Sequence, residues 1–524
     1  MKRSLGLAAV VLAALSAPVI AETSAPDPLG FVDPLIGTGP QGHTFPGATA
    51  PFGMVQLSPD TDATCQVRDC YAHAAGYSYH DPTIQGFSHT HFSGAGHSDL
   101  GDIMVMPQVG EVKLDPGTPA NPGYRQHFSH ATERASPGYY AVTLADSGIR
   151  AELTAGTRVG VHRYTFPAGA EAHLLLDYRT SLYDYPGKVL WSGLHLHPDG
   201  TLTGFRETRG WAPGRKLYFA MRFSAPLKDH AFIDRDPNVT YKGFQAPGRG
   251  SDAVAEKLGR ALEARLDFGQ LDKPLEVRVA LSGVDENGAI ANLEAEGGDF
   301  AMVRARTEAA WREALGRLEI DAPAPMRTSL YTALYHSLLA PSVWSDADGR
   351  YRGPDDQVHQ AKDFTFRSTF SLWDTFRAEH PLLTLVQPER TTSDVVNSLV
   401  ASQQESPYGI LPVWQFAGRE TWTMIGYHAV PVIADAWLKG LRGFDAEAAL
   451  KAMVASATYA PYGDLGDYMK LGYVPIDREP EAASKTAEYA YDDWTIARMA
   501  QAMGHEDIAQ RFFKRAGYWR NSFD

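Results

Sequence analysis

Apolar and polar residues alternate through much of the first half of the chain. The runs 217–223 and 275–281 place Leu, Phe, Met or Val at every second position. The run His173–Tyr178, HLLLDY, is continuously apolar at its centre and suits a strand buried on both faces. Because side chains alternate between the two faces of a strand, and Gly and Pro clusters punctuate residues 153–284, the pattern predicts a large all-β unit of the sandwich type.

The period of the apolar pattern changes near Gly297 from that of strands to that of helices. The pattern predicts helices over 300–315, over 330–338, from Asp445 through Met453, and from Ser484 to just before Gly504. Asp445 and Ser484 are expected as N-caps because their side chains can accept hydrogen bonds from the first turn. About seven helical segments and almost no strand pattern follow residue 320.

This change of pattern divides the chain into three parts. We expect a β-sandwich domain over 28–290, a helical linker over 291–322, and a helical domain over 323–524. A chain of this length can bury a large core in each of two domains.

The first residues match a secretion signal. Lys2 and Arg3 precede an apolar stretch from Leu5 to Leu15, and the segment ending at Ala21 fits a small-residue cleavage site. This apolar stretch is too short to span a bilayer, and no later stretch is long enough. We therefore expect a secreted or periplasmic protein that is cut after Ala21 and has no membrane span.

Charge and cysteine content narrow the choice of partners and compartment. The formal net charge of −14 argues against nucleic acid or an anionic membrane as partner. Cys65 and Cys70 are the only cysteines. In an oxidising compartment such a pair favours a disulfide, with a two-thiolate half of a metal site as the alternative.

Histidines and aspartates gather in a glycine-rich region over 36–102. His89 and His91 are two positions apart, so they face the same way if they lie on a strand. With His97 and Asp99 nearby they allow two interpretations, a zinc site or imidazoles that hydrogen-bond the loop backbone. We favour the second, because the spacing defines no zinc ligand set.

A second dense region, 364–428, contains the run FSLWDTFRAEHPLLTLVQPER. Trp373, Asp374 and Arg377 lie there on one short helical stretch that Pro381 can end. The ring can stack on the apolar C–H face of a sugar, while the carboxylate and the guanidinium bind its hydroxyls. The alternative is a core helix with an Asp–Arg pair.

Two further groups of residues carry candidate chemistry. Five residues fit the rim of a polar, aromatic-lined pocket: Trp414, Glu420, Trp422, Tyr427 and His428. Glu488 and Asp492 share one face of a predicted helix. They could be a catalytic carboxylate pair, but we favour ion-pair partners inside a helix bundle.

Six stretches of the chain resemble glycoside hydrolase family 92, the calcium-dependent exo-acting α-mannosidases. Between Val32 and Trp494 they follow one another in the same order as in the family: VDPLIGTGPQGHTFPGATAPFGMVQLSPD, GFSHTHFSGAGHSDLGD, FSLWDTFRAEHPLLTLVQPER, GILPVW, MIGYHAVPVIADA and SKTAEYAYDDW. Family members often have Cys where this chain has His97. The resemblance implies an N-terminal β-sandwich (supersandwich) domain, then an (α/α)6 barrel, with the active site between them.

The same resemblance implies removal of terminal α-linked mannose from glycans or glycoproteins by inverting hydrolysis. An acid and a base carboxyl stand about 6.5–9.5 Å apart in such enzymes, and a Ca²⁺ ion with hard oxygen ligands binds sugar hydroxyls. The family's catalytic carboxyls and most of its calcium ligands belong to motifs expected C-terminal to Asp524. We therefore expect an incomplete barrel and no catalytic pair within this chain. The sequence assigns no metal ligands.

The substrate-binding residues expected within the chain are Trp373, Asp374, Arg377, His89, His91, Asp99, Trp414, Glu420 and His428. A non-catalytic carbohydrate-binding protein is the alternative function, and a zinc-dependent hydrolase that uses His89, His91 and His97 ranks below it.

Overall fold

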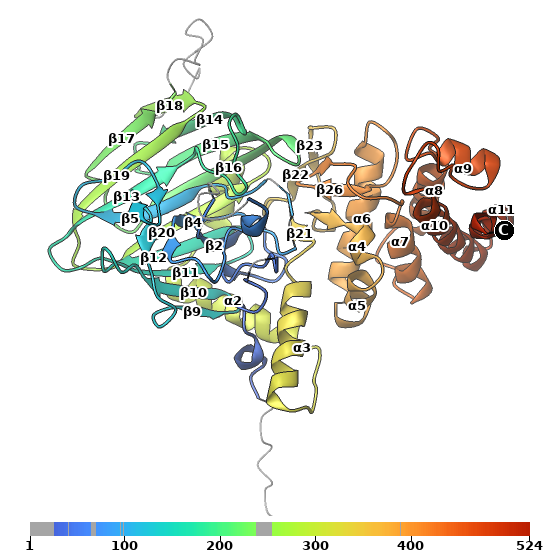
Figure 1. Ribbon diagram of the computed structural model, residues 1–524, viewed down its shortest axis with the longest axis horizontal. Helices are drawn as coiled ribbons and strands as arrows, with labels where there is room; N and C mark the ends of the chain where they lie inside the picture. The colour runs from blue at the N-terminus through green and yellow to red at the C-terminus, as the bar shows by residue number, and fades with distance from the viewer. Residues whose placement is uncertain are drawn as a thin grey trace, which may run out of the picture.

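The chain folds into a β-rich N-terminal domain beside a helical C-terminal domain (Figure 1). The computed structural model describes residues 26–39, 41–63, 70–94, 96–97, 99–236, 254–387 and 389–523. The predicted signal segment, 1–21, lies outside the described residues. Mixed architecture with strands before helices confirms the predicted fold class.

Two antiparallel sheets form the N-terminal domain. The first has seven strands in the order β1-β2-β4-β5-β13-β19-β17: Ala48–Thr49, Gln56–Asp60, Gly86–Ser88, Met104–Val109, Glu171–Asp177, Leu262–Gln270 and Asp229–Asp234. The second has nine, in the order β18-β14-β15-β16-β20-β12-β11-β10-β9: Ala255–Gly259, Val189–Leu196, Leu202–Arg209, Pro213–Phe223, Leu275–Ser282, Val159–Thr165, Arg150–Ala155, Tyr139–Thr143 and Arg134–Ser136.

Short elements decorate the two sheets. They are the ribbons β3 (Thr83–Ile84) with β8 (Gln126–His127) and β6 (Gly117–Thr118) with β7 (Asn121–Pro122), and the single-turn helices η1 (Pro28–Phe31) and η2 (Cys70–His73).

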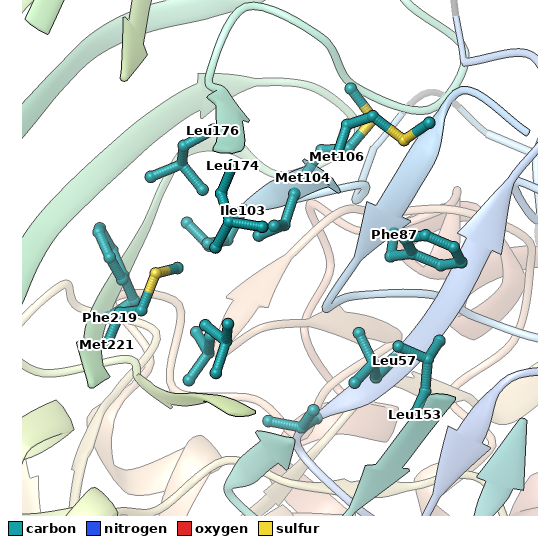
Figure 2. Close-up of a cluster of buried hydrophobic side chains, with 14 of the residues drawn as sticks. Leu57, Phe87, Ile103, Met104, Met106, Leu153, Leu174, Leu176, Phe219 and Met221 are labelled. Carbon is teal, nitrogen blue, oxygen red and sulfur yellow. The ribbon is translucent and has the colours of Figure 1, made fainter. Parts of the chain in front are cut away.

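The core of this domain lies between the inner faces of the two sheets. Figure 2 shows Leu57, Phe87 and Leu174 of the first sheet near Leu153 and Phe219 of the second. These five side chains are all fully buried. Since burying one such side chain contributes roughly 1.5–3 kcal/mol, the alternating pattern is enough to fix which face of each strand points inward.

The outer face of the second sheet is covered by two helices. They are α1 (Glu286–Ala295) and α2 (Phe300–Leu315), each capped by an aspartate at the preceding residue. The small side chains of Ala220 and Ala280 on this face let Ala289 and Phe300 of the helices pack closely. The segment expected as a linker therefore packs on the sheet, and α1 begins inside the range 28–290.

Nine α-helices and several short strands make up the described part of the C-terminal domain. The helices are α3 (Ala324–Ser337), α4 (Leu372–Thr375), α5 (Glu379–Val386), α6 (Arg390–Glu405), α7 (Ala429–Leu438), α8 (Ala446–Ala457), α9 (Leu465–Leu471), α10 (Ala482–Met503) and α11 (Glu506–Ala516), with η4 (Tyr518–Ser522) after them. The strands are β21 (Ser342–Val343), β22 (Arg350–Arg352), β23 (Val358–Gln360), β24 (Arg367–Ser368), β25 (Phe370–Ser371), β26 (Trp414–Phe416) and β27 (Arg419–Glu420).

Three details differ from the expectation for this domain. Its strands have two or three residues, too few to show a period of two in the sequence. Pro381 does not end the helix of Trp373. It lies in the first turn of α5, where a proline is tolerated because no intrahelical N–H bond is needed. The cap of α10 is Glu481 rather than Ser484, whereas Asp445 caps α8 by accepting from Ala448 N.

One face of α10 remains open to solvent. Tyr491 and Trp494 on this face are 44% and 45% exposed. Among the described residues, no helix combines the length and the apolar character that crossing a bilayer needs.

Candidate functional site at the domain interface

A cavity of about 490 Å³ lies between the two domains. The N-terminal domain contributes Tyr71, residues 92–94 and 96–97, and Trp211. The C-terminal half contributes 336, 339–341, 369–371, 374–375, 379–380, Trp414 and 423–424. A cleft of this size, lined from both domains, is the usual setting of a ligand site.

Aromatic rings form one side of the cavity. The ring centroid of Trp211 lies 4.0 Å from that of Trp414 and 4.5 Å from that of His97, on which it stacks. Trp211 Nε1 also donates to Thr423 Oγ1 at 2.8 Å, which ties the two domains together. Trp414 is buried, whereas His97 and Tyr71 are exposed. The exposed rings therefore offer flat faces, and Trp211 supports that of His97 from behind.

Carboxyl groups form a second side. Asp374, the third residue of α4, is exposed and accepts a hydrogen bond from Ser371 Oγ. Glu379, the first residue of α5, is partly buried. Burial and the nearby charge of Asp374 raise the pKa of Glu379 to about 8. At neutral pH the cavity wall thus carries a protonated carboxyl beside an exposed one.

Three imidazoles complete the polar lining. Burial lowers the pKa of His97 and of His336, and it lowers the pKa of His380 to about 4. At neutral pH all three rings are therefore uncharged, and an uncharged imidazole has one donor and one acceptor nitrogen. Such a lining suits a hydroxyl-rich, neutral ligand better than a charged one.

The backbone at the rim is held in an uncommon conformation. Thr369 and Met424, which both line the cavity, have φ values of 68° and 69°. A β-branched residue such as Thr369 rarely adopts the left-handed region, and such strain persists mainly at functional sites. This observation agrees with a binding role for the cavity.

Of the predicted residues, Asp374 and Trp414 reach this cavity, but Trp373 and Arg377 do not line it. Helix α4 ends at Thr375, so Asp374 and Arg377 diverge. Trp373 Nε1 donates to Glu488 Oε1 at 3.2 Å, and Arg377 lies 3.7 Å from the same carboxylate. Arg377 opens instead onto a second hollow of about 420 Å³ on the outside of the helical domain.

His89 lies in the core between the two sheets and contacts no cavity. Its Nδ1 donates to Ile103 O at 2.7 Å, and its Nε2 lies 2.9 Å from His162 Nε2. His162 Nδ1 in turn lies 2.7 Å from the hydroxyl of Tyr164. One assignment of the protons satisfies this row of hydrogen bonds, with Tyr164 donating to His162 and His162 donating to His89. Burial lowers the pKa of His89 to about 4, so both rings are neutral.

His91 is also a buried structural residue rather than part of the cavity wall. Its Nδ1 lies 2.7 Å from Gln56 O, and its Nε2 lies 2.9 Å from Asp60 Oδ1. Gly76 leaves room for this pair, since a Cβ there would stand 2.4 Å from Asp60 Oδ1. The two predicted histidines therefore orient the loop backbone, as favoured from the sequence.

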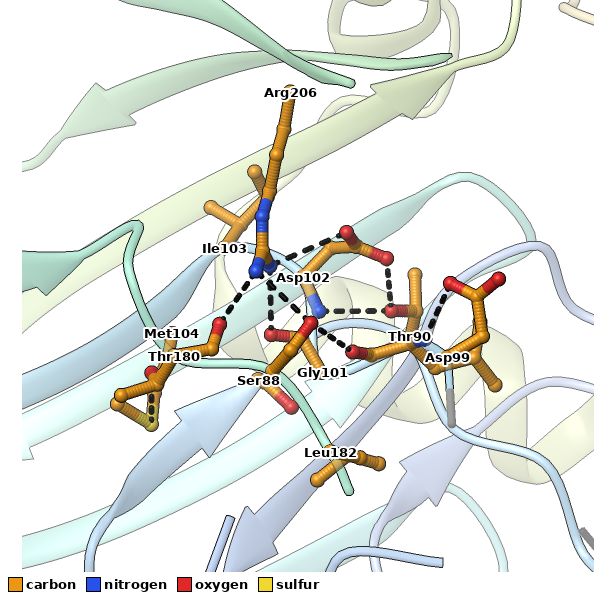
Figure 3. Close-up of polar contacts among 12 residues, drawn as sticks. Ser88, Thr90, Asp99, Gly101, Asp102, Ile103, Met104, Thr180, Leu182 and Arg206 are labelled. Atoms are coloured by element: carbon orange, nitrogen blue, oxygen red, sulfur yellow. Dashed lines mark hydrogen bonds and ion pairs between the residues drawn. The ribbon is translucent and has the colours of Figure 1, made fainter. Parts of the chain in front are cut away.

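Asp99 belongs to a buried ion-pair network. Figure 3 shows another part of this network, the contact of Asp102 with Arg206. It accepts from Arg215 Nη2 at 2.8 Å, and Arg215 Nη2 also donates to Asp102 at 2.8 Å. Arg206 reaches the other side of Asp102 at 3.3 Å and donates to Thr180 O at 2.6 Å. Although burial alone raises the pKa of Asp102, the two guanidiniums hold it below its usual value. The network fixes the loop that carries His97 into the cavity.

Glu420 supports the strand that carries Trp414. Its carboxylate accepts from the backbone N–H groups of Val413, Trp414 and Trp422 at 2.8–3.0 Å. Burial raises its pKa. Glu420 therefore positions Trp414 and does not itself line the cavity.

His428 is buried between two carboxylates of α10. Its Nδ1 lies 2.9 Å from Asp492 Oδ1, and its Nε2 lies 2.7 Å from Glu488 Oε2. Burial alone lowers the pKa of His428, but Asp492 and Glu488 raise it to about 9. Glu488 and Asp492 are thus ion-pair partners within the helix bundle, as favoured from the sequence. Glu488 also joins His428 to Trp373 and Arg377.

The described residues contain no group of three or more His, Cys, Asp or Glu side chains that could hold a metal ion. His89, His91 and His97 do not converge, which leaves the zinc interpretation without a ligand set in this part of the chain. Asp374 and Glu379, the carboxyls of the cavity wall, are too few to form a calcium cage among these residues.

Several cavity residues were not selected from the sequence. Glu379 and His380 lie inside the longer run 370–390, where a carboxyl and an imidazole shortly after Asp374 were a usable signal. Trp211 follows a strand in a segment with no other sign of function, and only the fold brings it to Trp414. His336 is the last-turn histidine of α3, at a position that periodicity alone assigns to a helix face.

Cys70, in η2 next to Tyr71, is disulfide-bonded. Its predicted partner, Cys65, lies outside the described residues.

Two domain families together match nearly the whole chain. The glycosyl hydrolase family 92 N-terminal domain matches residues 31–282, and the glycosyl hydrolase family 92 catalytic domain matches residues 288–524. The first match ends with β20, and the second begins inside α1.

Solved structures of similar sequence share this fold. Two structures of a family GH92 α-mannosidase from Bacteroides thetaiotaomicron, one of them with mannoimidazole, are 41% identical with a TM-score of 0.88. They match 95% of this chain, which covers 66% and 64% of theirs. A family GH92 inverting mannosidase from Bacteroides thetaiotaomicron VPI-5482 is 30% identical over 94% of this chain and 65% of its own, with a TM-score of 0.79.

A curated relative, an uncharacterized secreted glycosidase from Arthroderma benhamiae, is 25% identical over 95% of this chain and 62% of its own length. The chain therefore spans less than two thirds of these relatives. With both domain matches and a shared fold in place, the chain belongs to glycosyl hydrolase family 92.

Proposed function

We propose that this protein is a secreted glycoside hydrolase that removes terminal α-linked mannose from glycans or glycoproteins. The observation that carries the proposal is the cavity between the domains, where exposed aromatic rings face Asp374. The similar structures of a family GH92 α-mannosidase, one of them with mannoimidazole, support mannose as the sugar.

The cavity residues suit a pyranose in two ways. The C–H face of the sugar can lie on the exposed ring of Tyr71, or on that of His97, which stacks on Trp211. The exposed Asp374 can accept hydrogen bonds from two hydroxyls, and charged acceptors make stronger bonds than neutral ones. Neutral imidazoles at His336 and His380 add donors and acceptors without adding charge.

The catalytic step is proposed to be inverting, with its acid and base carboxyls supplied from outside the described residues. A Ca²⁺ ion is proposed as a cofactor that binds sugar hydroxyls, with most of its ligands outside these residues too. In this arrangement the present chain binds and orients the sugar.

Mannose release tests the proposal. We expect a protein of the relatives' length to release mannose from α-mannosides, with loss on chelation by EDTA, and the 524-residue chain to bind mannobiose in calorimetry. Asp374→Asn should weaken this binding. Asp435→Asn is the matched control, because it removes a half-buried carboxylate that lines the second hollow and not the cavity.

The outcomes separate the functions. Binding without release at either length would favour the alternative, a carbohydrate-binding protein. No binding of any mannoside by the folded protein, or equal binding by the Asp374 variant and the wild type, would contradict the assignment of the cavity.

A further inference from the structure

Two carboxyl groups stand next to each other on the cavity wall, yet they come from different helices. Asp374 belongs to α4 and Glu379 begins α5, and the chain turns between them at Ala378. Both line the same cavity, and they are close enough for the charge of Asp374 to act on Glu379. Their surroundings differ, because Asp374 is exposed and Glu379 is partly buried.

We propose that Glu379 contacts the ligand as a neutral carboxylic acid and, together with Asp374, selects an uncharged sugar hydroxyl. The Glu379 hydroxyl donates to the oxygen of the sugar hydroxyl, and the sugar hydroxyl donates to the Asp374 carboxylate. A sugar hydroxyl is both donor and acceptor, so it satisfies both groups at once. The assignment rests on the proposed function, since it takes the ligand to be a glycan.

The neutral state of Glu379 explains how two carboxyl groups can line the same cavity. Two ionised carboxylates side by side would repel each other and would offer the ligand only acceptors. Burial, with Asp374 nearby, keeps the pKa of Glu379 at about 8, so it is protonated at neutral pH. One neutral and one ionised carboxyl together provide the donor and the acceptor that a hydroxyl needs. An anionic group on the ligand would instead face Asp374 and be repelled.

The other titratable groups around Glu379 do not replace it in this role. The cavity contributes Tyr71, His97, His336 and His380. Lys439, the C-cap residue of α7, donates to Thr384 Oγ1 of α5, and Arg377, between α4 and α5, pairs with Glu488. The three histidines are neutral at pH 7 because burial lowers the pKa of each.

The proposal gives ligand binding a pH dependence above neutrality. If only the protonated form of Glu379 binds, the apparent Kd equals the intrinsic Kd divided by the fraction of Glu379 that is protonated. Between pH 7 and pH 9 the affinity should therefore fall roughly tenfold. Glutamine cannot ionise but still donates through its amide, so Glu379→Gln should keep the binding and lose the pH dependence.

Calorimetric titration of the 524-residue chain with mannobiose at pH 6, 7, 8 and 9 is the test. We expect the wild type to weaken above pH 8, Glu379→Gln to bind equally at every pH, and Glu379→Ala to bind roughly threefold to tenfold more weakly at pH 7, the loss of one hydrogen bond. Glu313→Gln is the matched control, since it removes an exposed carboxylate of α2. Circular dichroism at each pH checks that all variants are folded, and mannose 6-phosphate should bind more weakly than mannose.

Each result decides the matter. A pH dependence that persists in Glu379→Gln would assign the titration to another group and overturn the inference, as would full binding by Glu379→Ala. In both cases the proposed function would stand if Asp374→Asn still lost binding. Absence of mannobiose binding by the folded wild type would instead overturn both proposals.

Discussion

The buried network around Asp102 allows a direct prediction of stability. Asp102, Arg206, Arg215 and Asp99 are each no more than 2% exposed at the side chain. Replacing Asp102 by Asn leaves its shape but removes the carboxylate that faces two guanidiniums. A unit charge pair at the 2.8 Å seen for Arg215 and Asp102 attracts by roughly 6 kcal/mol at an effective dielectric constant of about 20. After desolvation, breaking one partner of a buried pair costs about 3–5 kcal/mol.

We therefore expect Asp102→Asn to lower the free energy of unfolding of the β-domain by about 3–5 kcal/mol. Asp99→Asn should cost less, because Arg215 then keeps Asp102, whereas the loss of Asp102 leaves Arg206 with no carboxylate. Since Asp102 has a lowered pKa, its contribution is present above the unfolded pKa and is lost as the pH falls through the folded pKa. The wild type should accordingly lose stability in acid more steeply than Asp102→Asn.

The free energy of unfolding of the β-domain is measured by urea denaturation with hydrogen exchange of peptides from β5 and β13. Exchange of these peptides reports opening of the β-domain rather than of the whole chain. Asp229→Asn is the surface control. Its carboxylate is 68% exposed, so the cost should stay within about 0.5 kcal/mol. A loss below about 1 kcal/mol for Asp102→Asn, or a larger loss for Asp99→Asn, would refute the reasoning.

Three further predictions concern other parts of the molecule. The raised pKa of His428 stabilises the helical domain below pH 6.5 by at most about 3 kcal/mol, partly offset by the buried Asp492, and this stabilisation is lost as pH rises through about 9. Thermal melting followed by helical circular dichroism should show the loss in the wild type. The same dependence of melting on pH in a double variant, His428→Gln with Asp492→Asn, would contradict the prediction. His89, with its pKa lowered to about 4, should make the β-domain lose roughly 3 kcal/mol as pH falls from 6.5 to 4, and hydrogen exchange of β4 that shows no such loss would count against a neutral ring. Trp211→Phe should lower the free energy of unfolding by about 1 kcal/mol, because it removes the hydrogen bond to Thr423. Thr423→Val removes the same bond and should lower stability equally in calorimetric melting. A clear difference between the two variants would mean that the loss of this bond is not the cause of both effects.

The sequence predicted long elements well because their periodicity repeats many times. The helix expected over 300–315 is α2, Phe300–Leu315, and the strand expected at 173–178 is β13, Glu171–Asp177. The strands of two or three residues in the helical domain were missed, because they depend on pairing between distant segments. Pro381 was misread as the end of a helix, since a proline marks a boundary without saying on which side the helix lies.

The candidate site was predicted less completely, for a related reason. Asp374 and Trp414 reach the cavity, as their residue types suggested, but a histidine or carboxylate is chosen equally often for structural pairing. His91, Asp99 and His428 are held by neighbours that only the fold brings near. The sequence alone does not identify such partners, because they lie tens to hundreds of positions away along the chain from the residues they hold.

The cavity has walls from both domains, and this constrains how such a protein can evolve. Trp211 and Trp414 touch across the boundary, so a shift of one domain against the other would separate the aromatic faces from Asp374. Neither half carries a usable site alone, so recombination that passes on one half without the other would give its host no advantage. Inheritance should therefore keep the two halves on one gene, and changes in sugar preference should arise as paired substitutions on opposite sides of the boundary.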